Sequence, residues 1–489
     1  MAQGAVLDIG SRRELFVDDC LIESMDNLSL RLHPPVPREV VFVADKPWEG
    51  NGCGFATLFR DGDLIRMYYK AWHLRFSKDK RGGYSMATSP LAVAYAESRD
   101  GIRWERPALG LFAFEGDTRN NLVWTQQDEK GRGTHGFSPF KDAKPDAPPE
   151  WRYKAVGAER SATKGDLHAL VSPDGIHWTL LDRPAMLNQV HGKFDSHNIA
   201  FWDGVRGEYR AYVRDFAPGK RRDIRTATSP DFVNWSDAAW LSYPGAPPEQ
   251  LYTNQVMPYH RAPHLFVGFP ARYVQRPWSP SIEALPEAEH RRMRASVQER
   301  YGAAISDAVF MSSRDGVVFK RWGEAFIRPG PQLEGNWAYG DNYPCWGLVE
   351  TPAERQPAPP ELSMYATESY WRGPARFRRY SMRLDGFVSV QAPRMGGEFT
   401  TPPLTFAGNQ LELNLSTSAA GSAKVEMQGA DGRRVEGFGL DDCVEMIGDR
   451  VDFRVRWGSG SDLASLAGKP VRLRFALKDA DLFALQFKG

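Results

Sequence analysis

Short runs of apolar or alternating residues, each of strand length, occupy most of the chain, and turn-forming residues separate them. Leu64–Ala71, Tyr153–Ala158 and Glu208–Val213 are three such runs. A period of two places alternate side chains on one face of a β-sheet, so these runs predict strands. The pattern changes over 287–300, which is rich in Glu, Arg, Ala and Met and predicts one helix with a solvated charged face.

A phrase of the form Ser-x-Asp-Gly-x-x-aromatic recurs four times, each copy after an apolar run. The copies begin at Ser98, Ser172, Ser229 and Ser313, and the third has Phe232 in place of Gly. Asp-Gly favours a tight turn, and a neighbouring Ser can hydrogen-bond the turn backbone. We therefore interpret these Asp residues as turn residues rather than catalytic ones. One such turn per repeat, with loops of varying length, is typical of a β-propeller.

The runs fall into five groups, which predict five blades. The blades span 41–107, 120–184, 194–241, 251–329 and 336–391, and the expected helix is an insertion in the fourth. The fifth group lacks the repeated phrase, and Leu384-Asp385-Gly386-Phe387 is its nearest echo. Terminal repeats are commonly atypical, so this departure does not alter the count.

The two ends of the chain differ from the repeats. Two short apolar runs within 5–35 predict strands that lead into the propeller. Beyond a Pro-rich junction at 393–403, alternating runs such as Leu411–Leu415 predict a β-sandwich. We expect a five-bladed propeller domain at 1–392 and a C-terminal sandwich domain at 393–489.

Composition narrows the functional class. The formal net charge of +1 gives no electrostatic footprint for nucleic acid or an anionic membrane. The start of the chain shows no basic region followed by an apolar stretch, and no apolar run could span a bilayer, so we expect a cytoplasmic protein. The four cysteines show no paired spacing, which argues against a zinc site, and we expect no metal or other cofactor. A homo-oligomer is possible.

Polar residues gather just before the first strand of each expected blade, where a propeller brings its blades together at the axis. They are Asp45, Trp48, Glu49, Asn51, His135, Asp195, His197, Asn198, Tyr252, Asn254, Trp337, Asp341 and Asn342. Residues near the end of later strands can point into the same place, and these are Arg214, Arg272 and Glu368. Such a set around one axis predicts a pocket for a small-molecule or oligosaccharide substrate.

These groups suit carbohydrate chemistry, because glycoside cleavage uses one protonated carboxyl group and a second carboxylate as nucleophile or base. We expect Asp195, Asp341 and Glu49 to be catalytic, with Asp45 in reserve. Aromatic neighbours would raise the pKa of Glu49 or Asp341 and suit either as the acid, whereas Asp195 is better placed to stay ionised. The remaining residues of the set would bind substrate, with Trp48 and Trp337 stacking on a sugar ring.

The stretch Phe194-Asp195-Ser196-His197-Asn198-Ile199-Ala200-Phe201-Trp202 resembles one found in invertases. Together with the repeated turn phrase and the predicted domains, it makes nearly the whole chain resemble the five-bladed propeller glycoside hydrolases. These are the invertase group of family 32 and the arabinanase and xylosidase group of family 43. The resemblance implies that Asp195 stabilises an oxocarbenium-like transition state.

The chain also departs from that pattern. Residues 45–51 replace the invertase nucleophile motif, and the segment 252–255 contains no carboxylate where the acid motif is expected. The segments 14–19 and 340–343 are similar to those of bacterial proteins labelled invertase-like, a label based on fold. Fold analogy does not identify a substrate, so fructan cleavage does not follow.

Four functions therefore stay open, of which an exo-acting glycoside hydrolase with an axial pocket is the first. A glycoside phosphorylase on the same fold would need a phosphate-binding cluster, which Arg214, Arg272 and Arg372 could supply. A non-catalytic carbohydrate-binding propeller is the third. A metal-dependent lyase or lactonase would need His135 and His197 to converge with Asp195 or Asp341.

Overall fold

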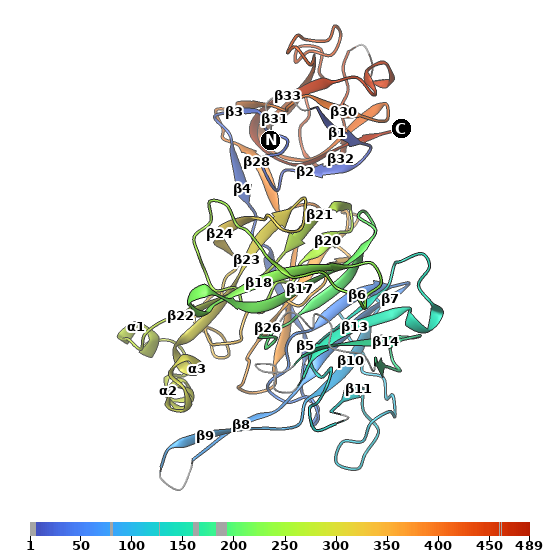
Figure 1. Cartoon of the computed structure of the whole chain (residues 1–489). Coiled ribbons are helices and arrows are strands. Elements are labelled where there is room, and N and C mark those ends of the chain that lie inside the picture. The colour runs from blue at the N-terminus through green and yellow to red at the C-terminus, as the bar shows by residue number, and fades with distance from the viewer. Residues whose placement is uncertain are drawn as a thin grey trace.

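The computed structural model describes residues 6–78, 82–126, 128–159, 166–181, 193–458, 460 and 462–489. Five sheets of four or five strands form the blades of a β-propeller, and a sixth, ten-stranded sheet lies beside them (Figure 1). The all-β prediction and the five-bladed propeller are confirmed. Apolar residues alternate inward from these sheets and form the cores between adjacent blades.

The blades follow one another along the chain. Blade one contains β6 (Thr57–Asp61), β7 (Leu64–Ala71), β10 (Ala92–Ser98) and β11 (Leu122–Thr125). Blade two contains β12 (His135–Lys141), β13 (Tyr153–Ala158), β14 (Leu167–Ser172) and β15 (Thr179–Leu180). Blade three contains β16 (Ile199–Asp203), β17 (Glu208–Ala217), β18 (Arg221–Ser229) and β19 (Ala239–Trp240).

The last two blades are less regular. Blade four contains β20 (Met257–Tyr259), β21 (Ala262–Gly268), β22 (Ala271–Gln275), β23 (Ala304–Ser313) and β24 (Lys320–Ile327). Blade five contains β25 (Val349–Thr351), β26 (Glu361–Glu368), β27 (Arg376–Arg383) and β5 (Val36–Val43). Short 3₁₀ helices lie at Pro149–Trp151, Pro218–Lys220 and Ala464–Leu466.

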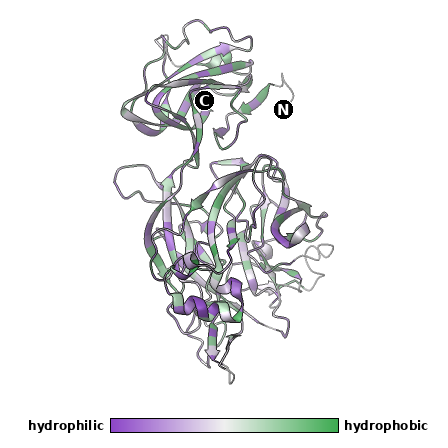
Figure 2. Cartoon of the chain, turned by 90° about the vertical axis from the view of Figure 1, so that its left-hand side faces the viewer, coloured by the Kyte–Doolittle hydropathy of each residue, from purple (hydrophilic) through white to green (hydrophobic). Residues whose placement is uncertain are grey.

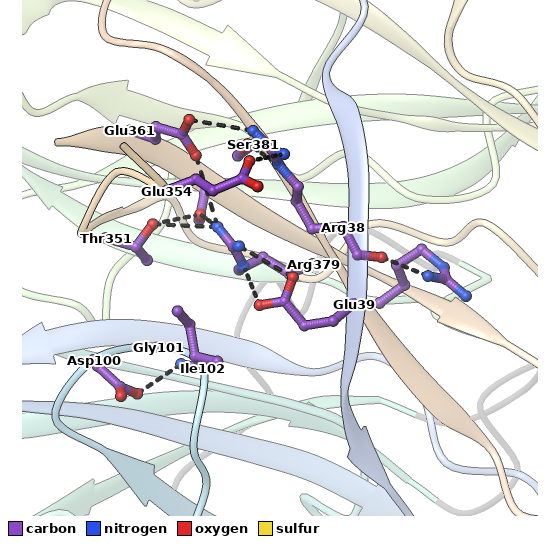
Figure 3. Close-up of polar contacts among 12 residues, drawn as sticks. Arg38, Glu39, Asp100, Gly101, Ile102, Thr351, Glu354, Glu361, Arg379 and Ser381 are labelled. Atoms are coloured by element: carbon purple, nitrogen blue, oxygen red, sulfur yellow. Dashed lines mark hydrogen bonds and ion pairs between the residues drawn. The ribbon is translucent and has the colours of Figure 1, made fainter. Parts of the chain in front are cut away.

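Strand β5 closes the ring, because it pairs with β27 as the outer strand of blade five. Arg379 on β27 forms a two-bonded ion pair with Glu39 on β5, at 3.0 and 3.1 Å (Figure 3). Arg38 donates to Glu354 at 2.8 Å and to Ser381 at 2.8 Å. The expected start of blade one at residue 41 is therefore wrong, since 36–43 belongs to the last blade. Because β5 pairs with β27 of the last blade, it covers an edge of that blade that would otherwise stay open.

The repeated phrase forms the same turn in four blades, after the third strand of blades one to three and after β23 in blade four. In the first copy, Ser98 Oγ accepts from the Gly101 amide at 2.8 Å and Asp100 Oδ1 accepts from the Ile102 amide at 2.8 Å. The other three copies repeat both contacts. The interpretation of these Asp residues as turn residues is confirmed.

These turns also join neighbouring blades. The carbonyl of Gly101 accepts from the Tyr365 hydroxyl of blade five at 2.8 Å, and the carbonyl of Gly175 accepts from the Tyr68 hydroxyl of blade one at 2.8 Å. The echo of the phrase in blade five behaves similarly, since Asp385 Oδ1 accepts from the Tyr259 hydroxyl at 2.8 Å. The phrase therefore holds the ring together.

The helical insertion lies between β22 and β23 as three short helices, α1 (Pro280–Glu283), α2 (Ala288–Val297) and α3 (Glu299–Ala303). The helix is confirmed, but its charged residues are not all solvated: Arg291 and Arg294 are buried. Arg291 donates to the carbonyls of Gly302 and Trp337, and Arg294 to that of Tyr339. Polar residues dominate the helices in Figure 2. The three helices extend from the propeller together with the hairpin of β8 (Leu74–Lys78) and β9 (Tyr84–Thr88) (Figure 1).

The ten-stranded sheet combines both ends of the chain. Its N-terminal strands are β1 (Leu7–Gly10), β2 (Arg13–Leu15), β3 (Ser24–Asp26) and β4 (Ser29–Leu32). The others are β28 (Val388–Ala392), β29 (Gly397–Thr400), β30 (Leu404–Phe406), β31 (Gln410–Gly429), β32 (Asp449–Arg454) and β33 (Val471–Lys488). The long strands β31 and β33 pair along most of their length around a continuous apolar core.

The N-terminal strands thus differ from the expected lead-in to the propeller, since all four pair with strands from the C-terminal part. Strand β28, on the propeller side of residue 392, lies in the same sheet. The domain boundary between 392 and 393 stays a prediction. Among the described residues, no helix has the length and apolar character needed to cross a membrane.

Candidate active site at the propeller hub

The inner strands of the blades begin together at one end of the propeller axis. Thr57 of β6 forms a parallel bridge with Trp346, which precedes β25, so neighbouring inner strands run side by side in one direction. Backbone with positive φ occurs at this end in four blades, at Phe55 (49°), Gly136 (61°), Gln255 (45°) and Asn342 (60°). Such conformations are costly outside glycine and concentrate at functional sites.

Asp195, just before β16, is the central carboxylate of this end. Its side chain is 36% exposed, and its Oδ1 lies 3.5 Å from His135 Nε2 and its Oδ2 3.7 Å from Arg214 Nη2. The Tyr252 hydroxyl donates to Oδ2 at 3.4 Å. Burial acts to raise the pKa of Asp195, but the surrounding positive charges outweigh it and the pKa is lowered. Those charges are on His135, Arg214, Lys70 and Arg300.

Lys70, near the end of β7, is 4% exposed and points toward aromatic rings. Its Nζ lies 4.6 Å from the centroid of Phe55 and 4.5 Å from that of Trp72, and it donates to the Tyr370 hydroxyl at 3.2 Å. Burial lowers the pKa of Lys70 to about 8, and the charge of Asp195 opposes that shift. The ammonium is therefore charged near neutral pH but easily deprotonated.

Arg300 on α3 brings the helical insertion to the same cluster. Its guanidinium lies 5.8 Å from the ring centroid of Tyr339, and the Tyr339 hydroxyl donates to that of Tyr252 at 3.3 Å. A contiguous group of buried aromatic residues surrounds these charges, and it includes Phe55, Tyr252, Tyr339, Tyr343, Tyr370 and Trp371. Aromatic walls exclude water and strengthen the charge interactions inside them.

The two histidines of the predicted site have different surroundings. His135 approaches Asp195, its Nδ1 is buried without a hydrogen-bond partner, and burial lowers its pKa to about 4. His197 is fully buried, with Nε2 3.2 Å from Thr57 Oγ1 and Nδ1 2.7 Å from Gln255 Nε2. His135 is therefore placed beside the carboxylate, whereas both ring nitrogens of His197 are occupied beneath it.

Glu49 lies in a closed ion pair. Its side chain is 0% exposed, and Oε1 accepts from the Tyr69 hydroxyl at 2.6 Å and from Arg106 Nε at 2.7 Å. Asp45 is 52% exposed and lies 3.7 Å from the same arginine. The indole of Trp48 donates to Asn121 Oδ1 at 2.7 Å. None of these three has a recorded contact with Asp195.

Asp341 is fully buried and accepts from backbone amides, that of Tyr370 at 2.9 Å and that of Ala338 at 3.2 Å. Burial raises the pKa of Asp341 to about 7, which is the direction expected for a general acid. Its oxygens face the backbone of the aromatic group. Tyr370 connects Asp341 with Lys70, because its amide donates to Asp341 and its hydroxyl accepts from Lys70.

The predicted amides bind the protein's own backbone. Asn198 Oδ1 accepts from the Arg214 amide at 3.0 Å, and Asn254 Nδ2 donates to the His197 carbonyl at 3.1 Å. Asn51 exchanges hydrogen bonds with the backbone of Leu74, and Asn342 Nδ2 donates to the Ser306 carbonyl at 3.2 Å. These side chains shape the strand entries that position the charged groups.

The remaining predicted residues lie in separate contacts. Arg272 pairs with Asp307 at 2.6 Å and with Glu249 at 2.8 Å. Glu368 accepts from Arg378 Nε at 2.5 Å. The indole of Trp337 donates to the Gly330 carbonyl at 2.8 Å, and Arg372 pairs with Glu287. The phosphate-binding set expected from Arg214, Arg272 and Arg372 is therefore not assembled.

Lys70, Arg300 and Tyr339 are the residues that the sequence reasoning missed. Lys70 lies within an apolar run, but it is close to the end of the second strand of its blade, as Arg214 is in blade three. Antiparallel pairing returns the end of a second strand to the end where the first begins. The position of Lys70 near the end of a second strand was therefore the sequence signal that could have identified it. Among the described residues, no three His, Cys, Asp or Glu side chains gather as a metal site.

No protein-family model and no curated protein matches the chain. It does match solved structures of glycoside hydrolases at low identity. One is a family 43 arabinoxylan arabinofuranohydrolase from Bacillus subtilis, with a TM-score of 0.42 and 9% identity over 93% of this chain and 99% of that one. Another is the Bombyx mori family 32 β-fructofuranosidase, with a TM-score of 0.39 and 9% identity over 94% of each chain.

A third match belongs to the family 130 mannoside phosphorylases, a family that contains glycoside hydrolases targeting β-1,2-mannosidic linkages in Candida mannan. Its TM-score is 0.40, with 14% identity over 74% of this chain and 95% of that one. Families 32 and 43, which the sequence resembles, are both represented among these structural matches. At TM-scores below 0.5 the matches carry no argument about this chain, and its chemistry has to be argued from the hub residues.

Proposed function

We propose that this protein cleaves a glycosidic bond at the hub, with Asp195 as the ionised carboxylate beside the anomeric carbon. One observation supports this most strongly: Asp195 is a partly exposed carboxylate at the point where blades one, two, three and four and the helical insertion contribute charged or phenolic groups. Its lowered pKa keeps it negative at neutral pH. A negative carboxylate stabilises an oxocarbenium-like transition state or attacks its carbon.

The surroundings also suit a sugar. Phenol hydroxyls of Tyr252 and Tyr339 lie next to the carboxylate and can exchange hydrogen bonds with substrate hydroxyls. The rings of Phe55 and Tyr370 provide apolar faces close to Lys70. Asp341 has the raised pKa of an acid but is fully buried, so its role as proton donor stays a prediction.

The test is turnover of a panel of aryl glycosides that includes furanosides and uronides. Asp195→Asn keeps the size of the side chain and removes its charge, so we expect kcat/KM to fall at least about 1,000-fold with the fold retained. Asp45→Asn is the matched control and should change kcat/KM by less than about 2-fold, because Asp45 is exposed and outside the cluster.

Unchanged turnover in Asp195→Asn would refute the assignment. Saturable sugar binding with no turnover of any glycoside by the wild-type protein would support the non-catalytic alternative instead.

A further inference from the structure

The cations around Asp195 outnumber the carboxylates that pair with them. Within the described part of the chain, Lys70 and Arg300 form no ion pair, and Arg214 pairs only with Asp195, at 3.7 Å. Lys70 has a phenol hydroxyl as its polar partner, and Arg300 donates to the Tyr301 hydroxyl at 3.3 Å. Elsewhere in the protein, buried Arg321 has a carboxylate partner, whereas buried Arg291 and Arg294 donate to backbone carbonyls instead. Lys70 and Arg214 are buried and Arg300 is half-buried. Buried charges ordinarily are paired, so the hub carries uncompensated positive charge.

Hydrogen-bond donors at the hub are also unused. Arg214 is 1% exposed, and its Nε and Nη1 are buried without a partner. The Nδ1 of His135 is buried without a partner as well, and it donates or accepts according to the tautomer of the ring. A buried donor without a hydrogen bond destabilises the protein, and more so when the group is charged. The two unpartnered donors of Arg214, beside one partly exposed carboxylate, indicate a place that a ligand completes.

The chemistry of that ligand follows from the donors. Guanidinium groups bind carboxylate and phosphate oxygens through paired N–H donors, and an ammonium adds charge to the same contact. A neutral sugar hydroxyl would satisfy hydrogen bonds but would leave the charge uncompensated. The aromatic surroundings strengthen attraction for an anion, because they lower the local dielectric.

We propose that Lys70, Arg214 and Arg300 form an oxyanion-binding subsite beside Asp195, which accepts a phosphate or carboxylate group during the proposed glycoside cleavage. The inference rests on that proposed function. The anion has two possible sources, inorganic phosphate as the attacking group and the carboxylate of a uronic acid unit in the substrate. In the first case a phosphate oxygen bonds to the anomeric carbon, the glycosidic C–O bond breaks, and the proton of hydrogen phosphate ends on the leaving oxygen.

Calorimetric titration of the full chain tests the subsite, with inorganic phosphate and glucuronate as probes and glucose as the neutral control. We expect saturable binding of at least one anion below about 10 mM. Arg300→Gln should weaken that binding at least about 10-fold, since it removes one charged donor. Arg292→Gln is the matched control on the same insertion, because Arg292 is 58% exposed, and its affinity should stay within about 2-fold of wild type.

The pH dependence gives a second readout. Lys70 loses its charge as the pH rises through about 8, so glucuronate, whose own charge is constant in this range, should bind more weakly at pH 9 than at pH 7. Lys70→Met should bind weakly at both pH values and lose this dependence. A wild-type protein that binds neither anion, or an Arg300→Gln variant that binds as well as wild type, would overturn the inference.

Turnover then distinguishes the two sources. Cleavage that requires added phosphate identifies phosphorolysis, whereas phosphate-independent cleavage of uronides over neutral glycosides identifies the carboxylate. Cleavage of neutral glycosides without anion binding would leave the proposed function standing and remove the subsite. Anion binding without any cleavage would support the subsite and contradict the proposed function.

Discussion

The two ends of the propeller axis differ, because one holds an apolar cavity and the other holds uncompensated positive charge. At the end where the inner strands finish, a cavity of about 1120 Å³ is lined largely by apolar residues that include Leu58, Phe140, Phe201, Met257 and Trp346. Charged residues at its edge are paired or exposed: Lys141 pairs with Asp61 at 2.6 Å and His260 with Glu350 at 2.9 Å, whereas Arg60 and Arg99 are exposed. At the end where the strands begin, Lys70 and Arg300 form no ion pair with any carboxylate that the structure describes.

Under the proposed function, cavity volume is a weaker guide to the site in this fold than uncompensated charge. A propeller encloses space wherever its inner strands diverge, and apolar side chains with paired or exposed charges at the edge are sufficient to explain it. Uncompensated charge in an aromatic enclosure is costly for folding alone, and its persistence calls for a function. Three predictions test this comparison.

The largest effect is expected within the charged end itself, at a carboxylate that we assign to stability. Glu49→Ala leaves Arg106, its partner at 2.7 Å, without its main counter-charge, so we expect a loss of about 3–5 kcal/mol in the free energy of unfolding. Urea denaturation measures it. Asp45→Ala should cost less than about 1 kcal/mol, because its pair with the same arginine is exposed.

A Glu49→Ala variant of wild-type stability would contradict this assignment. It would return Glu49 to the group of catalytic candidates.

A smaller effect is expected at the turns that join the blades at the opposite end. Gly175 has φ of 80°, and a Cβ there would lie 2.8 Å from the Tyr68 hydroxyl, so Gly175→Ala should destabilise the protein by about 2–4 kcal/mol. Gly62→Ala is the control: φ is 61° but nothing lies within 4 Å, and the cost should be about 1–2 kcal/mol.

Thermal unfolding of both glycine variants gives the comparison. Equal losses would show that backbone conformation alone, and not the junction between blades, determines the cost.

The smallest effect is expected from obstructing the apolar cavity. Ala143→Trp places a large ring at its lining, and turnover of the substrate found for the hub should stay within about 2-fold of wild type, because the chemistry is assigned to the other end. A fall in kcat/KM with unchanged stability would show that substrate uses this cavity, and the contrast between the two ends would fail.

Several features could be predicted from the sequence because they are local. The Ser-x-Asp-Gly phrase closes its own turn through hydrogen bonds between residues two or three positions apart, and its recurrence indicated the blades. The ring contacts of those turns could not be predicted, since Tyr68 meets Gly175 across 107 positions. The N-terminal strands were misplaced for the same reason, because their partners lie near the other end of the chain.

The candidate site divides along the same line. The position of Asp195 before an inner strand was sufficient to select it, and the same rule selected Glu49. Only the fold shows that Arg106, 57 positions away, closes Glu49 into an ion pair while Asp195 stays partly exposed. Lys70 lies within an apolar strand pattern, and that pattern does not indicate whether its charge is paired.

By itself the sequence determined the all-β class, the number of blades, the turn that each repeat forms and the set of polar residues at the strand entries. These depend on periodicity and on contacts within a few residues, which are encoded locally. The tertiary structure decided which of those polar groups are paired and which are free, and which strand closes the ring. Pairing and burial depend on residues that are distant in the chain and meet only after the blades have assembled.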